Sequence, residues 1–585
     1  MSRTSLMRLL AHPLTPLALA AALCTAAYAN ALGGQFVFDD IVLVRDAPHV
    51  HDITHFGRML SAMGESEGIG YRPVRTLTHM IEYQVFGPRA WGYHLTNVLL
   101  HLAVCLLLFR LCRRFGLGEL ASLASMAIFA LHPVHTESVA YISGRRDLLY
   151  ALFFTAGMLA YIRGVREKSR LLVFAALPLY VLGVFSKEQA VTLPVVLYLW
   201  DVLVHRRREA WPVRLWRPFQ HQPVFWAIIW AGALAFFLYR GVLLPRTSQP
   251  DWWGGSPAVN FATALAVHAR YLLVQIWPVD LLADYSAHAF PLAQGFLDRR
   301  TVLGILLLLA SLAIAVASTR RAPLLSLAII SYWVLLLPVS HIIPHHELAA
   351  EHHLYLPSAS LCLIAGAGLA ALAKRRRIVG WGLLVLLLPL LLGLTISRNR
   401  VWRSEESLWA DTVRKAPRCA RALFNLAIVH IKRDDLDSGE DLLRRSLIEK
   451  DFPRGRAYLA NVLTRKGRYA QAHDMLSNAI QADPDDLYVV KYHCQNLIHL
   501  GLSPEALPLL EKAVTTWPRD ADMHFMLSGT YLALGRPGEA LSESLTVLSL
   551  RPDDERTRKI AVLIAGKLGK ADLARKLEAG WSPDR

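Results

Sequence analysis

The chain has 585 residues, enough for several domains, and its composition changes sharply near Arg398. Its formal net charge is +17, but the arginines concentrate in short loops between apolar stretches. That placement is typical of a membrane protein and argues against nucleic-acid binding, because no base-reading motif accompanies the charge. The six cysteines have neither metal-ligand spacing nor a disulfide framework.

The first part of the chain contains repeated apolar stretches of roughly the length that crosses a bilayer, which is about 20 residues. We predict about eleven spans, near 14–32, 95–112, 118–134, 148–164, 170–186, 188–204, 224–240, 301–319, 323–339, 355–373 and 379–397. A further stretch, 262–277, contains His268 and Arg270 and stops at Trp277-Pro278. We therefore expect 262–277 to be an interfacial or re-entrant helix.

The loops predict the orientation. Arg3 and Arg8 favour a cytoplasmic N-terminus, and the arginine-rich loops also fall inside. The large segments 33–94 and 241–300 are then outside, as is everything after Arg400. We expect a multi-pass protein of the bacterial inner membrane with a periplasmic C-terminal part, or its equivalent in the ER lumen. A cleaved signal peptide ending near Ala27-Tyr28-Ala29 is an alternative for the first span.

The second part of the chain has an internal period of 34 residues, which is the tetratricopeptide period. Three sets of residues recur at this spacing: Gly467, Gly501, Gly535 and Gly569; Ala472, Ala506, Ala540 and Ala574; Pro484, Pro518 and Pro552. We predict an all-α chain with a membrane domain at 1–398 and a tetratricopeptide-repeat solenoid at 399–585. Such arrays offer surfaces for protein or peptide partners.

Polar residues gather at the predicted outer ends of the membrane helices. The motif FVFDD gives Asp39 and Asp40, Arg45 follows, and YRPVRTL gives Tyr71, Arg72 and Arg75. Later motifs add His94, Asn97, His132, His135, Glu137, Arg145, Arg146, Lys187, Glu188, Glu351, His352 and Tyr355. Charged groups at membrane depth are costly, so their convergence on one face predicts an active site.

The string HHELAAEHH resembles a zinc-protease motif but does not match it. HExxH requires histidine four residues after His346, and that position is Ala350. The spacing therefore specifies no metal, and we assign no cofactor, although a divalent metal held by a looser set of residues stays open.

The residues favour a lipid-linked sugar donor. No Gly-rich phosphate loop is present, so a soluble nucleotide has no evident binding site. Transfer from a polyprenyl phosphate needs a carboxylate base, cations for the leaving phosphate and an apolar groove for the chain. The membrane part offers residues of all three types.

The motifs FVFDD, YRPVRTL, WGYHLTNVLLH, ALHPVHTESVAYISGRRDLL, SKEQ and EHHLYLPS stand in the order found in a known family. In them the chain resembles the transmembrane and tetratricopeptide-repeat-containing O-mannosyltransferases and their bacterial relatives, over nearly its whole length. The resemblance implies a C-type glycosyltransferase fold. It also implies transfer, with inversion, of a sugar (mannose in the eukaryotic members) from a polyprenyl phosphate to Ser or Thr of exported proteins, with the repeats binding the acceptor.

The resemblance also implies residue roles. Either Asp39 or Asp40 is the general base. Donor phosphate or sugar contacts are assigned to Arg72, Arg145, Arg146, Lys187, Glu188, Glu351, His352 and Tyr355. His352 stands where the family often has arginine, so a phosphate contact there would require protonation.

Two other functions remain open. The sugar acceptor could be a lipid or glycan, or the chain could be a membrane-anchored repeat scaffold for envelope assembly without enzymatic activity.

Overall fold

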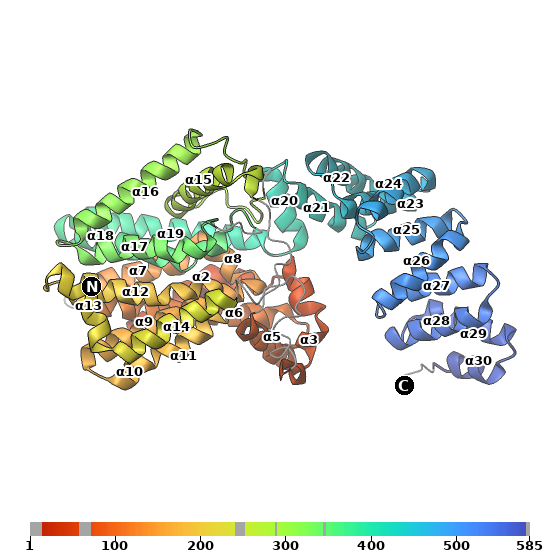
Figure 1. The fold of residues 1–585 in the computed structure, drawn as a ribbon, viewed down its shortest axis with the longest axis horizontal. Helices are drawn as coiled ribbons and strands as arrows, with labels where there is room; N and C mark the ends of the chain where they lie inside the picture. The colour runs from red at the N-terminus through yellow and green to blue at the C-terminus, as the bar shows by residue number, and fades with distance from the viewer. Residues whose placement is uncertain (1–13, 58–71, 240–251, 287–288, 343–346, 581–585) are drawn as a thin grey trace. The chain divides into compact units, whose positions relative to one another are not determined.

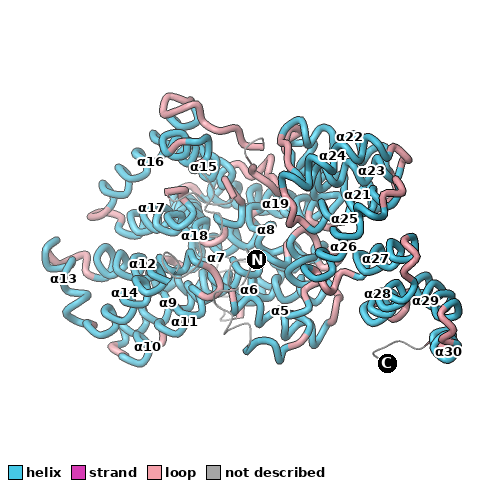
Figure 2. Tube along the Cα trace, turned by 45° about the vertical axis from the view of Figure 1, so that its right-hand side comes forward, coloured by secondary structure: helices cyan, strands magenta, loops and turns pink. Residues whose placement is uncertain are grey.

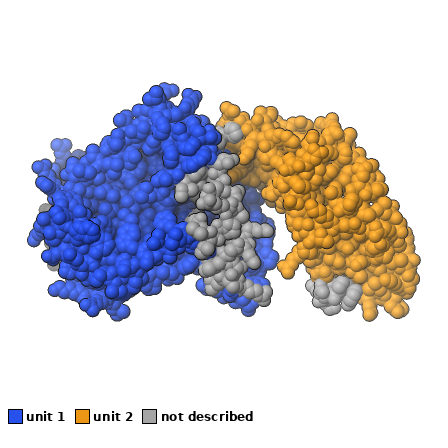
Figure 3. Space-filling model, viewed as in Figure 1, with its two compact units in different colours: residues 1–415 blue, residues 416–585 orange. Residues whose placement is uncertain are grey.

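The computed structural model describes residues 14–57, 72–239, 252–286, 289–342 and 347–580, which form helices and no strand. The chain divides into two compact units, Met1–Lys415 and Ala416–Arg585 (Figure 3). Helix α20 (Glu405–Lys415) belongs to the first unit, although it follows the predicted boundary at 398.

The first unit is a bundle of helices of very different lengths (Figure 1). Its helices are α2 (Thr15–Tyr28), α3 (Pro48–His51), α5 (Pro73–Phe86), α6 (Ala90–Arg114), α7 (Glu119–Leu131), α8 (Thr136–Val139), α9 (Arg145–Glu167), α10 (Arg170–Phe174), α11 (Ala176–Val184), α12 (Leu193–Trp200), α13 (Trp211–His221), α14 (Pro223–Leu238), α15 (Pro257–Ile276), α16 (Arg299–Ser318), α17 (Pro323–Leu336), α18 (Pro357–Arg375), α19 (Arg377–Val401) and α20.

Six helices in the described residues are long and apolar enough to cross a membrane: α6, α9 extended back to Ile142, α15, α16, α18 and α19. A seventh span results if α13 and α14, bent by 89° at their junction, count as one. The structure thus supports a multi-pass membrane protein, but not the predicted count of about eleven spans.

The difference has a local cause, because several predicted spans are interrupted. His132-Pro133 ends α7 after 13 residues, and a break at Ala175 separates α10 from α11. Proline lacks an N–H and disfavours a helical conformation of the preceding residue, so α7 cannot continue. Four shorter apolar helices remain: Thr15–Ala31, Glu119–Leu131, Arg170–Val184 and Pro323–Val339.

The expectation of an interfacial helix at 262–277 is also not supported. This stretch lies in α15, which has 20 residues and meets the same criteria of length and hydropathy as the other candidate spans. Its polar residues have partners: His268 Nδ1 lies 2.7 Å from the Ala264 oxygen, and Arg270 donates to the Asp280 oxygen at 2.8 Å. The bent α13–α14 pair is the helix pair whose geometry fits a re-entrant loop.

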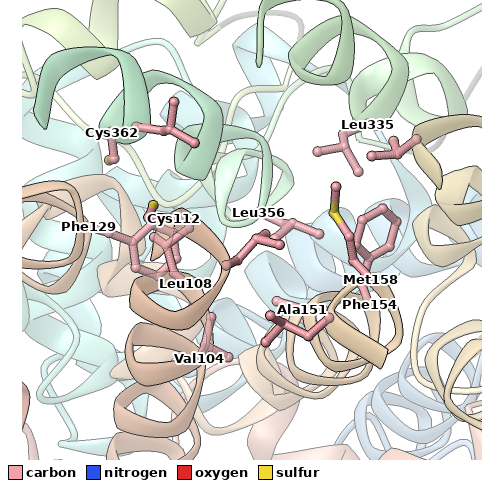
Figure 4. Packing of buried hydrophobic residues seen from close by; sticks show 14 of the residues in the cluster. Val104, Leu108, Cys112, Phe129, Ala151, Phe154, Met158, Leu335, Leu356 and Cys362 are labelled. Carbon is pink, nitrogen blue, oxygen red and sulfur yellow. The ribbon is translucent and has the colours of Figure 1, made fainter. Parts of the chain in front are cut away.

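A continuous apolar core joins α2, α6, α7, α9, α17 and α18. Figure 4 shows Leu108 of α6, Phe154 and Met158 of α9, and Leu335 of α17 around Leu356, which precedes α18. Small residues allow close helix approach in this bundle, because packing rather than water exclusion drives association in lipid.

Gly366 of α18 is the clearest test of this packing. A Cβ atom at Gly366 would lie 2.7 Å from Ser125 Cα of α7, whereas nothing lies within 4 Å of a Cβ at Gly368. We expect Gly366→Ala to lower the free energy of unfolding by about 1–3 kcal/mol through overpacking. Thermal unfolding in detergent measures this. Gly368→Ala on the same helix is the control, and equal melting temperatures for the two variants would contradict close α7–α18 packing.

The second unit is a stack of paired helices (Figure 2). They are α21 (Ala420–Lys432), α22 (Leu436–Glu449), α23 (Pro453–Arg465), α24 (Tyr469–Ala482), α25 (Leu487–His499), α26 (Ser503–Thr516), α27 (Ala521–Ala533), α28 (Pro537–Leu550), α29 (Glu555–Lys567) and α30 (Ala571–Glu578).

The period of 34 predicted from sequence corresponds to this pairing. Gly467, Gly501, Gly535 and Gly569 each follow the first helix of a pair with φ between 71° and 77°. Only glycine adopts this left-handed conformation without steric cost. Ala472, Ala506 and Ala540 are completely buried where the two helices of a pair approach. The tetratricopeptide prediction is therefore confirmed at the level of individual residues.

Candidate active site

The FVFDD segment makes a strained turn. Phe38 has φ of 53°, in the left-handed region that residues with a side chain rarely occupy. Its ring stacks on Tyr141 at 6.4 Å and meets Trp409 edge-on at 5.2 Å. These contacts hold the turn, after which Asp39 and Asp40 enter different environments. Strain of this kind is typical of functional sites.

Asp40 is an internal anchor. Its side chain is completely buried, and its Oδ1 accepts hydrogen bonds from the N–H of Ser143 at 2.7 Å and the hydroxyl of Ser143 at 2.6 Å. Its Oδ2 accepts from the Val37 N–H at 3.3 Å. Burial raises the pKa of Asp40 to about 7. Asp40 therefore ties the acidic turn to the segment before α9 and has little capacity left for a substrate.

Asp39 is partly exposed and faces charged groups. Burial raises its pKa, the positive charges of Arg146 and Arg75 oppose the rise, and the negative charge of Glu347 adds to it. A partly exposed carboxylate with a raised pKa is a better proton acceptor than an ordinary aspartate at neutral pH. The structure thus separates two adjacent carboxylates that the sequence could not distinguish.

Two arginines, Arg72 and Arg75, stand at the start of α5. Arg72, which precedes α5, pairs with Glu188 at 3.2 Å, so its charge is largely balanced. Arg75 lies one turn further and is 5% exposed, yet its Nε and Nη1 have no hydrogen-bond partner among the described residues. Burial, followed by repulsion from Arg72 and Arg146, lowers the pKa of Arg75 to about 9. An anion at this position would satisfy the buried guanidinium.

The adjacent arginines at the start of α9 have opposite environments. Arg145 is completely buried and makes an ion pair with Glu82, and it donates to Asn97 Oδ1 at 2.7 Å and to the Tyr93 oxygen at 2.8 Å. Arg146 lies 3.1 Å from His352 Nε2 and 3.6 Å from Asp147, and its Nε has no hydrogen bond to any residue that the structure describes. Arg145 is therefore a structural residue, whereas Arg146 remains able to meet a ligand.

Lys187 has a buried partner of its own. Its Nζ lies 2.5 Å from Asp147 Oδ1, and both side chains are at most 2% exposed. This pair joins the segment after α11 to α9. Neither Lys187 nor Glu188 is thus available to a donor unless an existing ion pair breaks.

His352 connects three elements. The N–H of His352 donates to Glu137 Oε2 at 2.9 Å, its Nδ1 lies 2.6 Å from Glu137 Oε1, and its Nε2 faces Arg146. Burial lowers the pKa of His352 to about 3, so the ring is neutral. A neutral ring donates through Nδ1 and accepts from Arg146 through Nε2. His352 therefore orients Arg146, and the protonated phosphate contact considered from the sequence does not fit this geometry.

The remaining predicted residues hold the bundle together. Glu351 accepts from the Leu282 N–H at 2.6 Å and the Tyr285 hydroxyl at 2.7 Å, and it pairs with Arg398 at 3.4 Å. Tyr355 contacts His101 Nδ1 at 2.7 Å. Buried contacts with backbone or core groups likewise involve Asn97 with Val139 and Tyr141, His132 with Gln275, His135 with Phe129 and Ser358, and His94 beneath Gly34.

Two predicted candidates are not assigned to this cluster. Arg45 is exposed and pairs with the neighbouring Asp46 at 2.7 Å. Tyr71 lies outside the described residues.

Two groups of side chains in the described residues have ligand atoms close enough to hold a metal: Glu347, His352 and His353, and the buried set Cys24, His101 and Cys105. Both fit a metal poorly, because hydrogen bonds already use the histidines. Arg146 faces His352 Nε2, and Tyr355 and the Ala130 oxygen contact the two nitrogens of His101.

The candidate site therefore combines one partly exposed carboxylate, Asp39, with two arginines, Arg75 and Arg146, whose charges act on it. Such a set can accept a proton and stabilise a departing anion. The motif YRPVRTL placed Arg75 among the outer-face polar residues but gave it no role at the site. The signal was a second arginine in the same motif, three residues after Arg72.

Comparison with known protein families supports the repeat assignment. Tetratricopeptide-repeat models match residues 420–445 and 496–555.

Most of the chain is similar to curated proteins from animals. It is 28% identical over 425 residues to a protein O-mannosyl-transferase of Caenorhabditis elegans, covering 69% of this chain and 58% of that protein. It is 28% identical over 555 residues to protein O-mannosyl-transferase Tmtc3 of Drosophila melanogaster, covering 81% and 59%. It is 22% identical over 639 residues to human TMTC3, covering 94% and 69%. The chain thus spans about three fifths of the length of the first two relatives, and these homologues confirm the resemblance carried by the motifs.

Proposed function

We propose that this chain is a membrane glycosyltransferase. It transfers a sugar, mannose by analogy with the names of its relatives, from a polyprenyl phosphate to Ser or Thr hydroxyls of proteins. The observation that carries the proposal is the contrast between the two carboxylates: the charges of Arg75 and Arg146 act on the partly exposed Asp39, while Ser143 and Val37 engage Asp40 fully.

The proposed reaction is a single displacement. Asp39 takes the proton of the acceptor hydroxyl, the acceptor oxygen forms a bond to the anomeric carbon, and the bond from that carbon to the phosphate oxygen breaks. The lipid phosphate leaves with the electron pair, and Arg75 and Arg146 stabilise its charge. Attack opposite the leaving group inverts the anomeric configuration.

An apolar pocket between α6, α9, α17 and α18 supports a lipid-linked donor. It is lined by Leu108, Phe154, Met158, Leu335 and Leu356 among others and has a volume of about 60 Å³ (Figure 4). Typical ligand sites measure about 300–1,000 Å³, so the lining side chains would have to move apart to admit an isoprenoid chain. Leu356 directly follows Tyr355 and lies four residues after His352, so this pocket begins near the polar site.

The distribution of arginines along the membrane helices supports a site at the outer face of the membrane. Helices α6 and α9 carry His94, Asn97, Arg145 and Arg146 near their first turns, and Arg113, Arg114, Arg163 and Arg166 near their last. The positive-inside rule places the last turns in the cytoplasm and the site outside. Helix α19 starts after Lys374–Arg376 and ends at Val401, so the same rule places the repeats outside.

An acidic limb in the pH profile is expected from this assignment. Only ionised Asp39 accepts a proton, and burial raises its pKa. Transfer activity should therefore fall as the pH drops through this raised pKa, at a higher pH than an ordinary aspartate would give. Initial rates of transfer between pH 4 and 8 measure this, and a rate independent of pH down to 4 would contradict Asp39 as the base.

The function itself is tested with the full chain in lipid nanodiscs. The donors are polyprenyl-phosphate mannose and, separately, GDP-mannose, and the acceptors are Ser/Thr-rich peptides from exported proteins. Mass spectrometry of the peptides should show added hexose with the lipid donor alone. Hexose from GDP-mannose without lipid carrier would overturn the donor assignment.

The same experiment separates the other two functions. Hexose on co-reconstituted lipid or glycan, with unmodified peptides, would indicate the alternative acceptor. A scaffold would be indicated if cells keep the protein's function when both Asp39 and Arg146 are replaced but lose that function when the repeats are deleted.

A further inference from the structure

A second pocket lies toward the C-terminal ends of α6 and α9, whereas the candidate active site lies near their N-terminal ends. It has a volume of about 470 Å³, within the range of about 300–1,000 Å³ that ligand sites occupy. Its rim carries Arg110, Arg113, Arg114 and Arg163. The apolar residues that line it come from α6, α9 and α10: Leu107, Ala156, Leu159, Ala160 and Leu172.

Helical spacing produces this shape. On α6, Leu107, Arg110 and Arg114 stand at i, i+3 and i+7, so they share one face. On α9, Ala156, Ala160 and Arg163 stand at i, i+4 and i+7, so they also share one face. Each face therefore runs from apolar to cationic toward the helix end. The alanines on α9 leave space that larger apolar side chains would fill.

The four arginines of this pocket have too few acidic partners to balance their positive charge. Glu167 lies 3.2 Å from Arg114 and 3.3 Å from Arg163, and Glu119 lies 3.3 Å from Arg113. Two carboxylates thus face four guanidinium groups, and Arg110 makes no ion pair with any described residue. The pocket has a net positive charge that an anionic ligand would balance.

The pocket is distinct from the site around Asp39. Arg146 and Arg163 are separated by 17 residues of one helix, which corresponds to about 25 Å at 1.5 Å per residue. Both helices are candidate membrane spans, so the two sites lie toward opposite surfaces of the bilayer. The sugar donor's phosphate cannot contact both.

We propose that this pocket binds an anionic phospholipid. The phosphate contacts the arginine rim, and an acyl chain lies along the apolar wall formed by Leu107, Ala156 and Ala160. A soluble anion would use the rim but not the wall, and an apolar molecule would use the wall but not the rim. Basic pockets between membrane helices are known to accommodate acidic headgroups.

The test measures lipid bound to the full chain by native mass spectrometry after reconstitution in mixed phosphatidylcholine and phosphatidylglycerol. The test variant is Arg110→Gln with Arg163→Gln. The control, Arg320→Gln with Arg321→Gln, makes the same charge change in the exposed turn between α16 and α17. Native protein and control should retain phosphatidylglycerol. The test variant should bind it about thirtyfold more weakly, equivalent to about 2 kcal/mol for two arginines.

Two results would overturn the proposal: equal phosphatidylglycerol retention in the test variant and the control, or displacement by soluble glycerol phosphate at comparable concentration, which would indicate a site for free anions. Ala160→Phe provides a second variant that fills the pocket without a change of charge. It should also lose phosphatidylglycerol, and retention in a folded Ala160→Phe protein would count against the acyl-chain position.

Discussion

The Asp39→Asn variant is expected to lose sugar transfer by a factor of about 10²–10⁴, the usual contribution of a positioned general base. The asparagine has nearly the same shape but cannot take the acceptor proton. Asp39 is partly exposed, and asparagine keeps an oxygen that can accept the hydrogen bond from Tyr141, so the fold should persist. The measurement is the initial rate in nanodiscs with polyprenyl-phosphate mannose, accompanied by thermal unfolding of both proteins.

Asp40→Asn is the matched control on the neighbouring residue. Its Oδ1 can still accept both hydrogen bonds from Ser143, whereas the bond from the Val37 N–H is lost because Nδ2 is a donor. One such bond is worth about 0.5–1.5 kcal/mol, so we expect a lower melting temperature and a loss of activity of about tenfold or less. The reverse pattern, with Asp40→Asn inactive and Asp39→Asn active, would reject the assignment of the base.

Replacing Arg145 by methionine is expected to unfold much of the membrane unit. The change leaves the carboxylate of Glu82 buried without its partner, and it removes the hydrogen bonds to Asn97 and Tyr93. Breaking a buried ion pair from one side costs about 3–5 kcal/mol. The yield of folded protein and the unfolding temperature in detergent report this loss. Adding Glu82→Gln to Arg145→Met should recover part of it, because the uncompensated charge is then gone.

Arg146→Met, at the next position, is expected to behave in the opposite way. Asp147 keeps its pair with Lys187, so the fold should change little. Transfer should fall by about 10²–10³, as is usual when one group that stabilises transition-state charge is removed. Similar effects of the two arginine variants on both stability and rate would contradict the distinct roles assigned to Arg145 and Arg146.

Sequence periodicity was a reliable guide to the repeats but not to the number of spans. The glycine and alanine positions at a spacing of 34 follow from local backbone and packing requirements. The predicted number of membrane spans was too high because some apolar stretches are broken into shorter helices, as at His132-Pro133 after α7. Apolar composition reports burial or lipid contact, but it does not report whether one helix is continuous across the stretch.

The same contrast holds for the candidate site. Ordered motifs brought the right segments to attention, because charged residues between membrane helices are costly unless they have partners. They did not separate structural from reactive groups: Arg145 and Arg146 are adjacent and chemically identical, as are Asp39 and Asp40. A role for Arg75 was not evident from the sequence for the same reason, because groups contributed by other helices decide whether its guanidinium has a partner.

The sequence by itself determined a multi-pass membrane protein with a tetratricopeptide array, and it located the acidic turn and the arginine motifs. Those features depend on composition and on local spacing, and both can be read directly from a single sequence. Only the tertiary structure decided that Asp40 accepts from Ser143, that Glu82 neutralises Arg145, and that the charges of Arg146 and Arg75 act on Asp39. The physical reason is that the availability of a charged group depends on the partners that distant segments bring within hydrogen-bonding distance.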